Sequence, residues 1–329
     1  MGTVNTMWLG KNSLKHLGVW LVGLAIFSAH AQRAIWMWEA DSYAMLEHAE
    51  LAQNDIAFLQ SKGIGTLYLY ADAYQGRNLL VEQPQTYAAL IERLHKAGFE
   101  VHALLGSWYL HTERYVLPEQ QRKAHQMLQR VIRYNAQVKT IQQFDGVSLD
   151  IEPHLLDAWD TQKTYLLEQF VQLSQALMQL KVQAHASFKL GAAIPFWFDA
   201  IAIESRGTTQ MLNQHLQDIY DYVVLMDYRD HAQGADGILS HAQDELAYAQ
   251  RIGKSVWIGV ETGANEIEKI SFHHLREADM ERELDLVNAA LASHAEFGGV
   301  VIHHFSTYRQ WVQRLDPSSL KQDSNSNAP

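Results

Sequence analysis

Residues 144–154 read FDGVSLDIEPH, and apolar residues alternate with polar ones along this stretch. In a β-strand, residues two apart share a face, so Asp150 and Glu152 are expected to point the same way, with Ser148 behind them. Two acids side by side repel each other, and burial raises the cost of their charges. The stretch therefore predicts a buried strand that ends in a general acid and a supporting carboxylate. A solvated strand end with ordinary surface acids is the alternative.

Strand-like and helix-like segments alternate along the rest of the chain. The expected strands are residues 34–38, 66–70 and 99–105, the stretch above, and residues 190–194, 222–226, 255–260 and 300–304. The expected helices are residues 51–62, 85–97, 119–138, 161–181, 210–217, 240–252 and 280–294. Eight strands that alternate with helices predict a single-domain (β/α)8 TIM barrel, an α/β fold. An open doubly wound sheet is disfavoured because no glycine-rich phosphate loop follows any strand.

The first residues resemble an export signal rather than part of the barrel. Lys11 and Lys15 precede an apolar run over residues 17–28, and small residues follow it. This order predicts a signal peptide over residues 1–31, cleaved after Ala31, and hence a secreted or periplasmic bacterial protein. The run is short for a membrane span, so no span is expected in the mature chain. An uncleaved N-terminal anchor is the alternative.

Composition limits the partners of the remaining chain, whose barrel is expected to fill residues 32–315. Residues 316–329 are rich in Ser, Asn and Asp, which predicts a disordered polar tail. The sequence has no cysteine, and therefore no disulfide and no thiol nucleophile. Its 26 Lys and Arg residues against 37 Asp and Glu residues give a formal net charge of −11. Such a charge argues against nucleic acid as a partner and favours a neutral or cationic substrate.

Aromatic and acidic residues gather where the expected strands end, and this end of a (β/α)8 barrel carries the active site. They are Trp38 and Glu39, Tyr70 and Asp72, Trp108, Asp150, Glu152 and His154, Trp197, Asp227, Tyr228 and Arg229, Glu261, and His303 and His304. Sugar rings stack on flat aromatic faces, and their hydroxyl groups hydrogen-bond to acids. Cleavage of a glycosidic bond also needs a carboxylic acid beside the leaving oxygen. The combination predicts a site for an oligo- or polysaccharide.

Three short motifs resemble those of family 18 glycoside hydrolases, the chitinase group. Residues 145–152, DGVSLDIE, resemble its DGxDxDxE signature. Residues 226–229, MDYR, resemble its MxYD motif, with Arg229 in place of the final Asp. Residues 298–303, GGVVIH, resemble its last strand, with His303 in place of the Trp that forms the floor under the sugar. The resemblance implies a divergent glycoside hydrolase with a TIM-barrel fold.

The same resemblance implies roles for individual residues. Glu152 would be the general acid, and Asp150 would orient the N-acetyl group of the substrate and assist Glu152. Tyr228 would hydrogen-bond the acetyl carbonyl as its oxygen attacks the anomeric carbon. Ser148 stands where the signature has its second Asp, which weakens the relay beneath Asp150. The expected substrate-binding residues are Trp38, Trp108, Trp197, Asp227, Arg229, Glu261 and His303.

Two other functions are compatible with the sequence. Glu261 ends the seventh expected strand and could pair with Glu152 in a retaining mechanism, in which two carboxylates lie about 5–5.5 Å apart. Ile151 stands where such enzymes carry Asn, and Glu261 could instead bond Arg229 or a ligand hydroxyl. The third possibility is a non-catalytic carbohydrate-binding barrel. The presence of Glu152, at the position of the general acid in the motif, favours an enzyme instead.

Histidine is abundant, with 17 residues, so a metal site has to be weighed. The sequence has no HExxH pair and no other spacing that is diagnostic of zinc. Adjacent residues of a strand point to opposite sides, so His303 and His304 are not expected to face one site. Neither a metal nor a cofactor is therefore expected.

Overall fold

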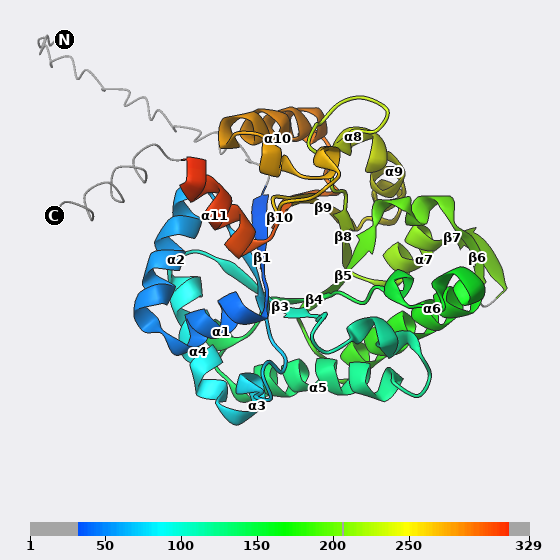
Figure 1. Ribbon diagram of the computed structural model, residues 1–329. Coiled ribbons are helices and arrows are strands. Elements are labelled where there is room, and N and C mark those ends of the chain that lie inside the picture. The colour runs from blue at the N-terminus through cyan, green and yellow to red at the C-terminus, as the bar shows by residue number, and fades with distance from the viewer. Residues whose placement is uncertain (1–31, 206, 316–329) are drawn as a thin grey trace, which may run out of the picture. The chain divides into compact units, whose positions relative to one another are not determined.

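The computed structural model describes residues 32–205 and 207–315, in which eight parallel strands form a closed barrel (Figure 1). The strands are β1 (Gln32–Met37), β2 (Thr66–Tyr70), β3 (Glu100–Leu105), β4 (Gly146–Leu149), β5 (Lys189–Pro195), β8 (Tyr222–Met226), β9 (Ser255–Glu261) and β10 (Phe297–His303). Around the barrel they follow the order β1, β10, β9, β8, β5, β4, β3 and β2. The predicted (β/α)8 TIM barrel is confirmed, and each predicted strand overlaps an observed one.

Helices surround the barrel (Figure 1). They are α1 (Glu39–Glu47), α2 (Ala49–Ser61), α3 (Leu79–Glu82), α4 (Pro84–Lys96), α5 (Gln121–Gln137), α6 (Trp159–Gln183), α7 (Leu212–Ile219), α8 (Ile238–His241), α9 (Gln243–Ile252), α10 (Glu277–Leu291) and α11 (Phe305–Leu315). Short 3-10 turns lie in the loops: η1 (Thr112–Val116), η2 (Thr140–Gln142), η3 (Pro153–Leu155), η4 (Phe196–Ala200), η5 (Glu268–Ile270) and η6 (Phe272–His274).

One predicted helix, over residues 210–217, starts too early. The antiparallel hairpin of β6 (Ala202–Ser205) and β7 (Thr208–Met211) occupies its first residues, and α7 begins only at Leu212. The β-branched Thr208 and Thr209 suit a paired strand. Leu212 and Leu216, one helical turn apart and both fully buried, are the first residues that give the helix an inward face.

The helices pack on the barrel through one face, as α5 illustrates. Its buried residues recur every three or four positions: Ala124, Met127, Leu128, Val131 and Tyr134. Such a stripe faces the strands while the rest of the helix faces water. Each fully buried Val or Leu side chain contributes about 1.5–3 kcal/mol, so the stripe fixes the helix to the barrel.

A second, smaller core fills the inside of the barrel. Its largest side chains are the rings of Trp36, Tyr68, Tyr222 and Trp257, all buried. A Cβ atom on Gly191 would lie 2.4 Å from the Tyr222 ring, so the missing side chain of one strand makes room for the ring of the next. The inside of the barrel is therefore a packed layer, as in other barrels of this type.

The fourth strand is shorter than predicted. The sequence predicts a strand through Glu152, but β4 ends at Leu149. Asp150 is still tied to β3, because its N–H donates to the carbonyl of Leu105 at 2.7 Å. Gly106 follows Leu105, and a Cβ atom on it would lie 2.3 Å from the Asp150 carbonyl oxygen. Only glycine at this position therefore allows the backbone at residue 106 to lie so close to Asp150. The two acids consequently lie just beyond the strand, with Glu152 in the loop before η3.

The predicted signal peptide over residues 1–31 and the predicted tail over residues 316–329 lie outside the described residues. From β1 to α11 the structure covers the segment in which the barrel was predicted. Within residues 32–205 and 207–315, no helix is long and apolar enough to cross a membrane.

Candidate active site

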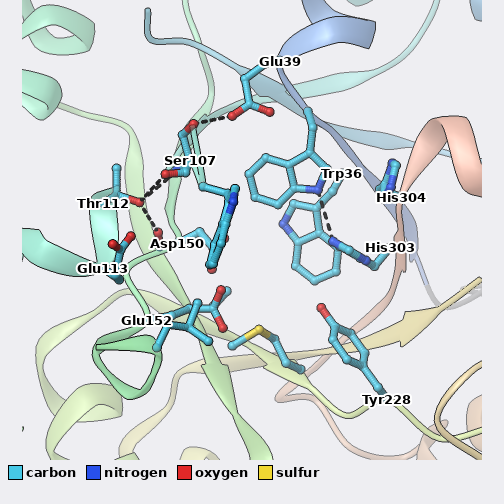
Figure 2. A pocket seen from close by; sticks show the side chains of 15 residues that line it. Trp36, Glu39, Ser107, Thr112, Glu113, Asp150, Glu152, Tyr228, His303 and His304 are labelled. Carbon is cyan, nitrogen blue, oxygen red and sulfur yellow. Dashed lines mark hydrogen bonds between the residues drawn. The ribbon is translucent and has the colours of Figure 1, made fainter. Parts of the chain in front are cut away.

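Residues that end or follow the strands line a cavity of about 450 Å³ (Figure 2). The lining residues are Trp36, Trp38, Glu39, Ser107, Trp108, Thr112, Glu113, Asp150, Glu152, Leu155, Ala193, Met226, Tyr228, His303 and His304. Figure 2 shows Glu113, Asp150 and Glu152 on one side of the cavity, and Tyr228, His303 and His304 on the other. The cavity therefore lies where active sites of (β/α)8 barrels lie, at the carboxyl ends of the strands.

Asp150 is an acid in a setting that disfavours its charge. Its Oδ1 atom is buried and has no hydrogen-bond partner among the described residues. Burial first, and then the charges of Glu152 and Glu39, raise the pKa of Asp150 well above its ordinary value. A carboxyl group in this position keeps its proton at pH values where an exposed aspartate has lost it, and can then donate a hydrogen bond.

Glu152 lies in a more polar setting than Asp150. Its side chain is 25% exposed, and its Oε2 atom lies 3.2 Å from Nε2 of His154. The His154 ring packs edge-on against Trp159 and Trp197, with ring centres 6.1 and 5.3 Å away. Its Nδ1 atom is buried and has no partner in the described part of the chain. The aromatic neighbours thus hold the imidazole in place beside the Glu152 carboxyl group.

Tyr228 faces the acids across the cavity. Burial first, and then the charges of Glu261, Glu152 and Asp150, raise the pKa of its phenol well above the ordinary value. The phenol is therefore neutral at ordinary pH and can donate a hydrogen bond into the cavity.

A line of hydrogen bonds runs from Trp38, in the cavity wall, through His303 to Glu261. Nε1 of Trp38 donates to Nε2 of His303 at 3.1 Å, and Nδ1 of His303 lies 2.6 Å from Oε2 of Glu261. Because Nε2 accepts, the arrangement assigns the ring proton to Nδ1, which donates to Glu261.

The Glu261 carboxylate is enclosed by donors. Its Oε1 atom accepts the backbone N–H groups of Thr262 at 2.7 Å and Gly263 at 2.5 Å. Burial alone would raise the pKa of Glu261, but the hydrogen bond and charge of His303 and these N–H groups outweigh burial and lower it. Glu261 is not among the residues that line the cavity. It is therefore placed to orient His303.

Three more of the predicted site residues lie outside the cavity lining. Trp197 packs in the aromatic cluster around His154. Asp227 is fully buried and accepts from Nδ1 of His241 at 2.9 Å; burial, partly offset by this bond, raises its pKa to about 6. Arg229 pairs with Asp236 at 2.8 Å, not with Glu261. Around Tyr228 the lining includes Met226 and Tyr228 but neither Asp227 nor Arg229.

The cavity also contains residues that were not among the predicted ones. They are Trp36, Ser107, Thr112, Glu113, Leu155, Ala193 and Met226, whereas Glu39 and His304 were expected at the strand ends and do line it. Alternation along the first and sixth predicted strands, two residues back from Trp38 and Tyr228, would have found Trp36 and Met226. The loop after β3 offers no such signal, although it brings Ser107 close enough for its hydroxyl to donate to Glu39.

His303 and His304 both line the cavity, so the expectation that they face opposite sides is wrong. The rule of alternation holds within a strand, and β10 ends at His303. Burial, and next its neighbour His303, lower the pKa of His304 to about 4. Among the described residues, no group of three His, Cys, Asp or Glu side chains is arranged to hold a metal ion.

The sequence matches no protein-family profile and no curated protein. The structure, however, is similar to solved glycoside hydrolases. One is a GH18 chitinase from Cycas revoluta in complex with (GlcNAc)3, with a TM-score of 0.52 and 13% identity over 86% of this chain and 97% of that chain. Another is a beta-galactosidase from the psychrophilic Marinomonas ef1, with a TM-score of 0.51 and 10% identity over 83% of this chain and 53% of that chain.

These likenesses define the class of fold. The chain has the closed (β/α)8 barrel of glycoside hydrolases, and the resemblance to family 18 is confirmed as a likeness of fold. Sequence identities of 10 and 13% show a shared fold alone, so the activity has to be argued from the site.

Proposed function

We propose that this chain is a glycoside hydrolase that cleaves O-glycosidic bonds in an oligo- or polysaccharide. One observation carries the proposal: Asp150 and Glu152 share a cavity with Tyr228 at the carboxyl ends of the strands. Two neighbouring acids in unlike settings, one buried and one partly exposed, suit the division of labour that glycosidic cleavage requires. The GH18 chitinase with the similar fold was solved with (GlcNAc)3, which supports a saccharide as the ligand.

In the proposed reaction Glu152 donates its proton to the glycosidic oxygen as the bond to the leaving sugar breaks. The carbonyl oxygen of a 2-acetamido group on the remaining sugar attacks the anomeric carbon. Tyr228 and protonated Asp150 donate hydrogen bonds that align this group and stabilise the charge it develops. Water, deprotonated by the Glu152 carboxylate, then opens the cyclic intermediate and restores the acid.

The aromatic wall supports a sugar ring even though His303 replaces the expected tryptophan. Trp36 and Trp38 lie with their ring centres 5.7 and 6.1 Å from the His303 ring, and all three line the cavity. Trp38, the residue after β1, thus offers a flat apolar surface on which a sugar can stack, and the buried Trp36 ring supports His303 from inside the barrel.

The alternative mechanism, in which Glu261 is the nucleophile, has less support. Its Oε1 atom accepts two backbone N–H groups and its Oε2 atom is bonded to His303. A carboxylate held by three donors and absent from the cavity lining is poorly placed to attack an anomeric carbon.

The test is to measure reducing-end release from chitin oligosaccharides and from a panel of other polysaccharides. Wild-type protein should cleave at least one substrate. Glu152→Gln keeps the shape of the side chain but cannot donate a proton, so turnover should fall by about 10²–10⁴-fold while ligand binding persists. Normal turnover by this variant would exclude Glu152 as the acid. Binding to the panel by wild-type protein without any cleavage would identify a carbohydrate-binding barrel instead.

We also propose that the chain is exported, with cleavage after Ala31. The support is the order of the N-terminal sequence, in which basic residues precede an apolar run and small residues.

A further inference from the structure

The cavity lining is rich in acids. Glu39, Glu113 and Glu152 line it, together with Asp150, whose pKa burial raises. Among the described residues that line it, none is a lysine or an arginine. A ligand in this cavity therefore meets acids and rings, and the balance of charge can select between ligands.

Two histidines also line the cavity. The pKa of His304 is lowered to about 4, first by burial and next by its neighbour His303, so its ring is neutral near pH 7. Nε2 of His303 accepts from Trp38 and its Nδ1 atom is bonded to Glu261, so both of its ring nitrogens are already engaged.

Glu113 is a buried acid in the cavity lining. The residue is only 8% exposed and lines the cavity from η1. Its Oε1 atom lies 3.4 Å from Nδ1 of His111 and 3.8 Å from Nε of Arg114, both on the surface. The buried Oδ1 atom of Asp150, on the same side of the cavity, has no hydrogen-bond partner among the described residues (Figure 2). A buried acceptor without a donor is costly, and a ligand that brings N–H groups would satisfy it.

We propose that the cavity selects a positively charged sugar, namely an aminosugar with a free amine within a partly N-acetylated oligosaccharide. This rests on the proposed glycosidase function and adds the substrate class. An ammonium group offers three donors to carboxylates in charge-assisted hydrogen bonds. The indole face of Trp38 attracts the same charge.

Two neighbouring sugars share the cavity in this arrangement. An acetamido group binds beside Tyr228 and Asp150, where the reaction takes place. The ammonium group of the adjoining sugar lies on the side of Glu113 and Glu39. Sugars that carry carboxylate or sulfate groups are repelled by the same acids.

The experiment compares the binding of two trisaccharides of one length by calorimetry at about pH 6, where the amine is protonated. The first, the amine trimer, carries one free amine next to an N-acetylated sugar, and the second is the fully acetylated N-acetylglucosamine trimer. The Glu152→Gln variant is used throughout, so that neither ligand is cleaved. The amine trimer should bind at least about tenfold more tightly at ~0.05 M salt, and the advantage should shrink by about threefold or more at ~0.5 M.

Charge variants identify the groups responsible. Glu113→Gln and Glu39→Gln, each added to Glu152→Gln, should each reduce the preference for the amine trimer by about threefold or more. Glu204→Gln is the matched control, because Glu204 is exposed on β6 and does not line the cavity, and it should leave the preference unchanged. Thermal melting establishes that each variant is folded. Two independent cavity variants keep the test decisive if one of them does not fold.

The outcomes separate this inference from the proposed activity. Equal or weaker binding of the amine trimer overturns the inference, as does a preference that neither cavity variant reduces. If wild-type protein still cleaves fully acetylated oligosaccharides, the glycosidase proposal survives that result. A salt-sensitive preference for the amine trimer without cleavage of any substrate would support the inference and contradict the glycosidase.

Discussion

Asp150 and Glu152 are two residues apart, yet their surroundings differ. Asp150 has a buried oxygen without a partner and a pKa raised by burial. Glu152 is a quarter exposed and touches His154. Unlike settings let identical functional groups take different parts in one reaction, one as a fixed donor and the other as the group that exchanges protons with water.

The different roles proposed for these groups predict the order in which three single substitutions lower activity. Asp150→Asn and Tyr228→Phe should each lower kcat by about 10–100-fold or more, because each removes a group that acts on the developing charge. Glu261→Gln should have a milder effect, mainly on KM, because Glu261 acts through His303. Steady-state kinetics on a chitin oligosaccharide and on its counterpart with a plain 2-hydroxyl measure the effect.

The contrary ranking would favour the other mechanism. An inactive Glu261→Gln variant that azide rescues would make Glu261 the nucleophile. Equal cleavage of substrates with 2-acetamido and 2-hydroxyl groups would likewise remove the role assigned to Tyr228 and Asp150.

At the residue scale, the sequence predicts which side chains face the cavity where the alternation of a strand sets their direction. Asp150, Glu152, Tyr228 and Trp38 all line the cavity, because each follows closely on a strand whose pattern is clear. Trp197 does not, although it follows a strand equally closely, because η4 turns the chain and carries its ring to His154. Past a strand end the direction of a side chain depends on tertiary contacts that alternation cannot supply.

At the scale of elements, α7 and α9 meet at a buried acid. Glu245 of α9 is fully buried, its Oε1 atom accepts from Asn213 of α7 at 3.0 Å, and its Oε2 atom has no partner within residues 32–205 and 207–315. Burial, the largest effect, raises the pKa of Glu245 to about 8. The folded protein therefore keeps this proton up to about pH 8, whereas the unfolded chain loses it near the ordinary value of 4.5.

The free energy of unfolding should consequently fall as pH rises between about 4.5 and 8, because the unfolded chain binds fewer protons there. Glu245→Gln mimics the protonated form at every pH. We expect it to raise Tm at about pH 8 by a few degrees and to change Tm little at about pH 4.5. Calorimetric melting over this range is the measurement, with Glu119→Gln at an exposed position as control. A Tm difference that does not depend on pH would contradict the assignment.

Strands and helices were easier to predict than the loops between them. Buried stripes such as that of α5 repeat with the helical period, so the pattern is present in the sequence. The segment from β3 to α5 has no period, yet it contributes Ser107, Trp108, Thr112 and Glu113 to the cavity. Its path depends on Gly106 beside Asp150 and on the hydrogen bond between Ser107 and Glu39, which join parts of the chain far apart in sequence.

At the scale of the whole molecule, the acidic charge of the chain has to be considered together with its proposed export. The chain carries a formal net charge of −11, and four carboxyl groups line its cavity. An exported acidic protein would meet its saccharide in the surroundings of the cell, where salt screens charges only beyond about 10 Å. Acids inside the cavity keep their influence on a bound amine under such conditions.

Export predicts a specific mass. Protein purified from its native host should begin at Gln32, because a signal peptidase would cut after Ala31. Intact-mass spectrometry of the periplasmic and extracellular fractions measures this, with a cytoplasmic fraction for comparison. A chain that keeps its first residues and stays in the cytoplasm would refute export, and a full-length chain in the membrane fraction would indicate an uncleaved anchor.

The engagement of both nitrogens of His303 has a consequence for how its wall can evolve. With one nitrogen bonded to Trp38 and the other to Glu261, a sugar meets only the carbon atoms of the imidazole. The imidazole ring therefore presents a small flat surface to the ligand, without a free hydrogen-bond donor or acceptor. Replacing a tryptophan by this histidine would reduce the contact area with the sugar. The surface would stay flat and apolar as long as Trp38 and Glu261 keep both ring nitrogens bonded. A sugar-binding wall can thus keep its flat apolar surface even where the tryptophan of the sequence motif has been replaced.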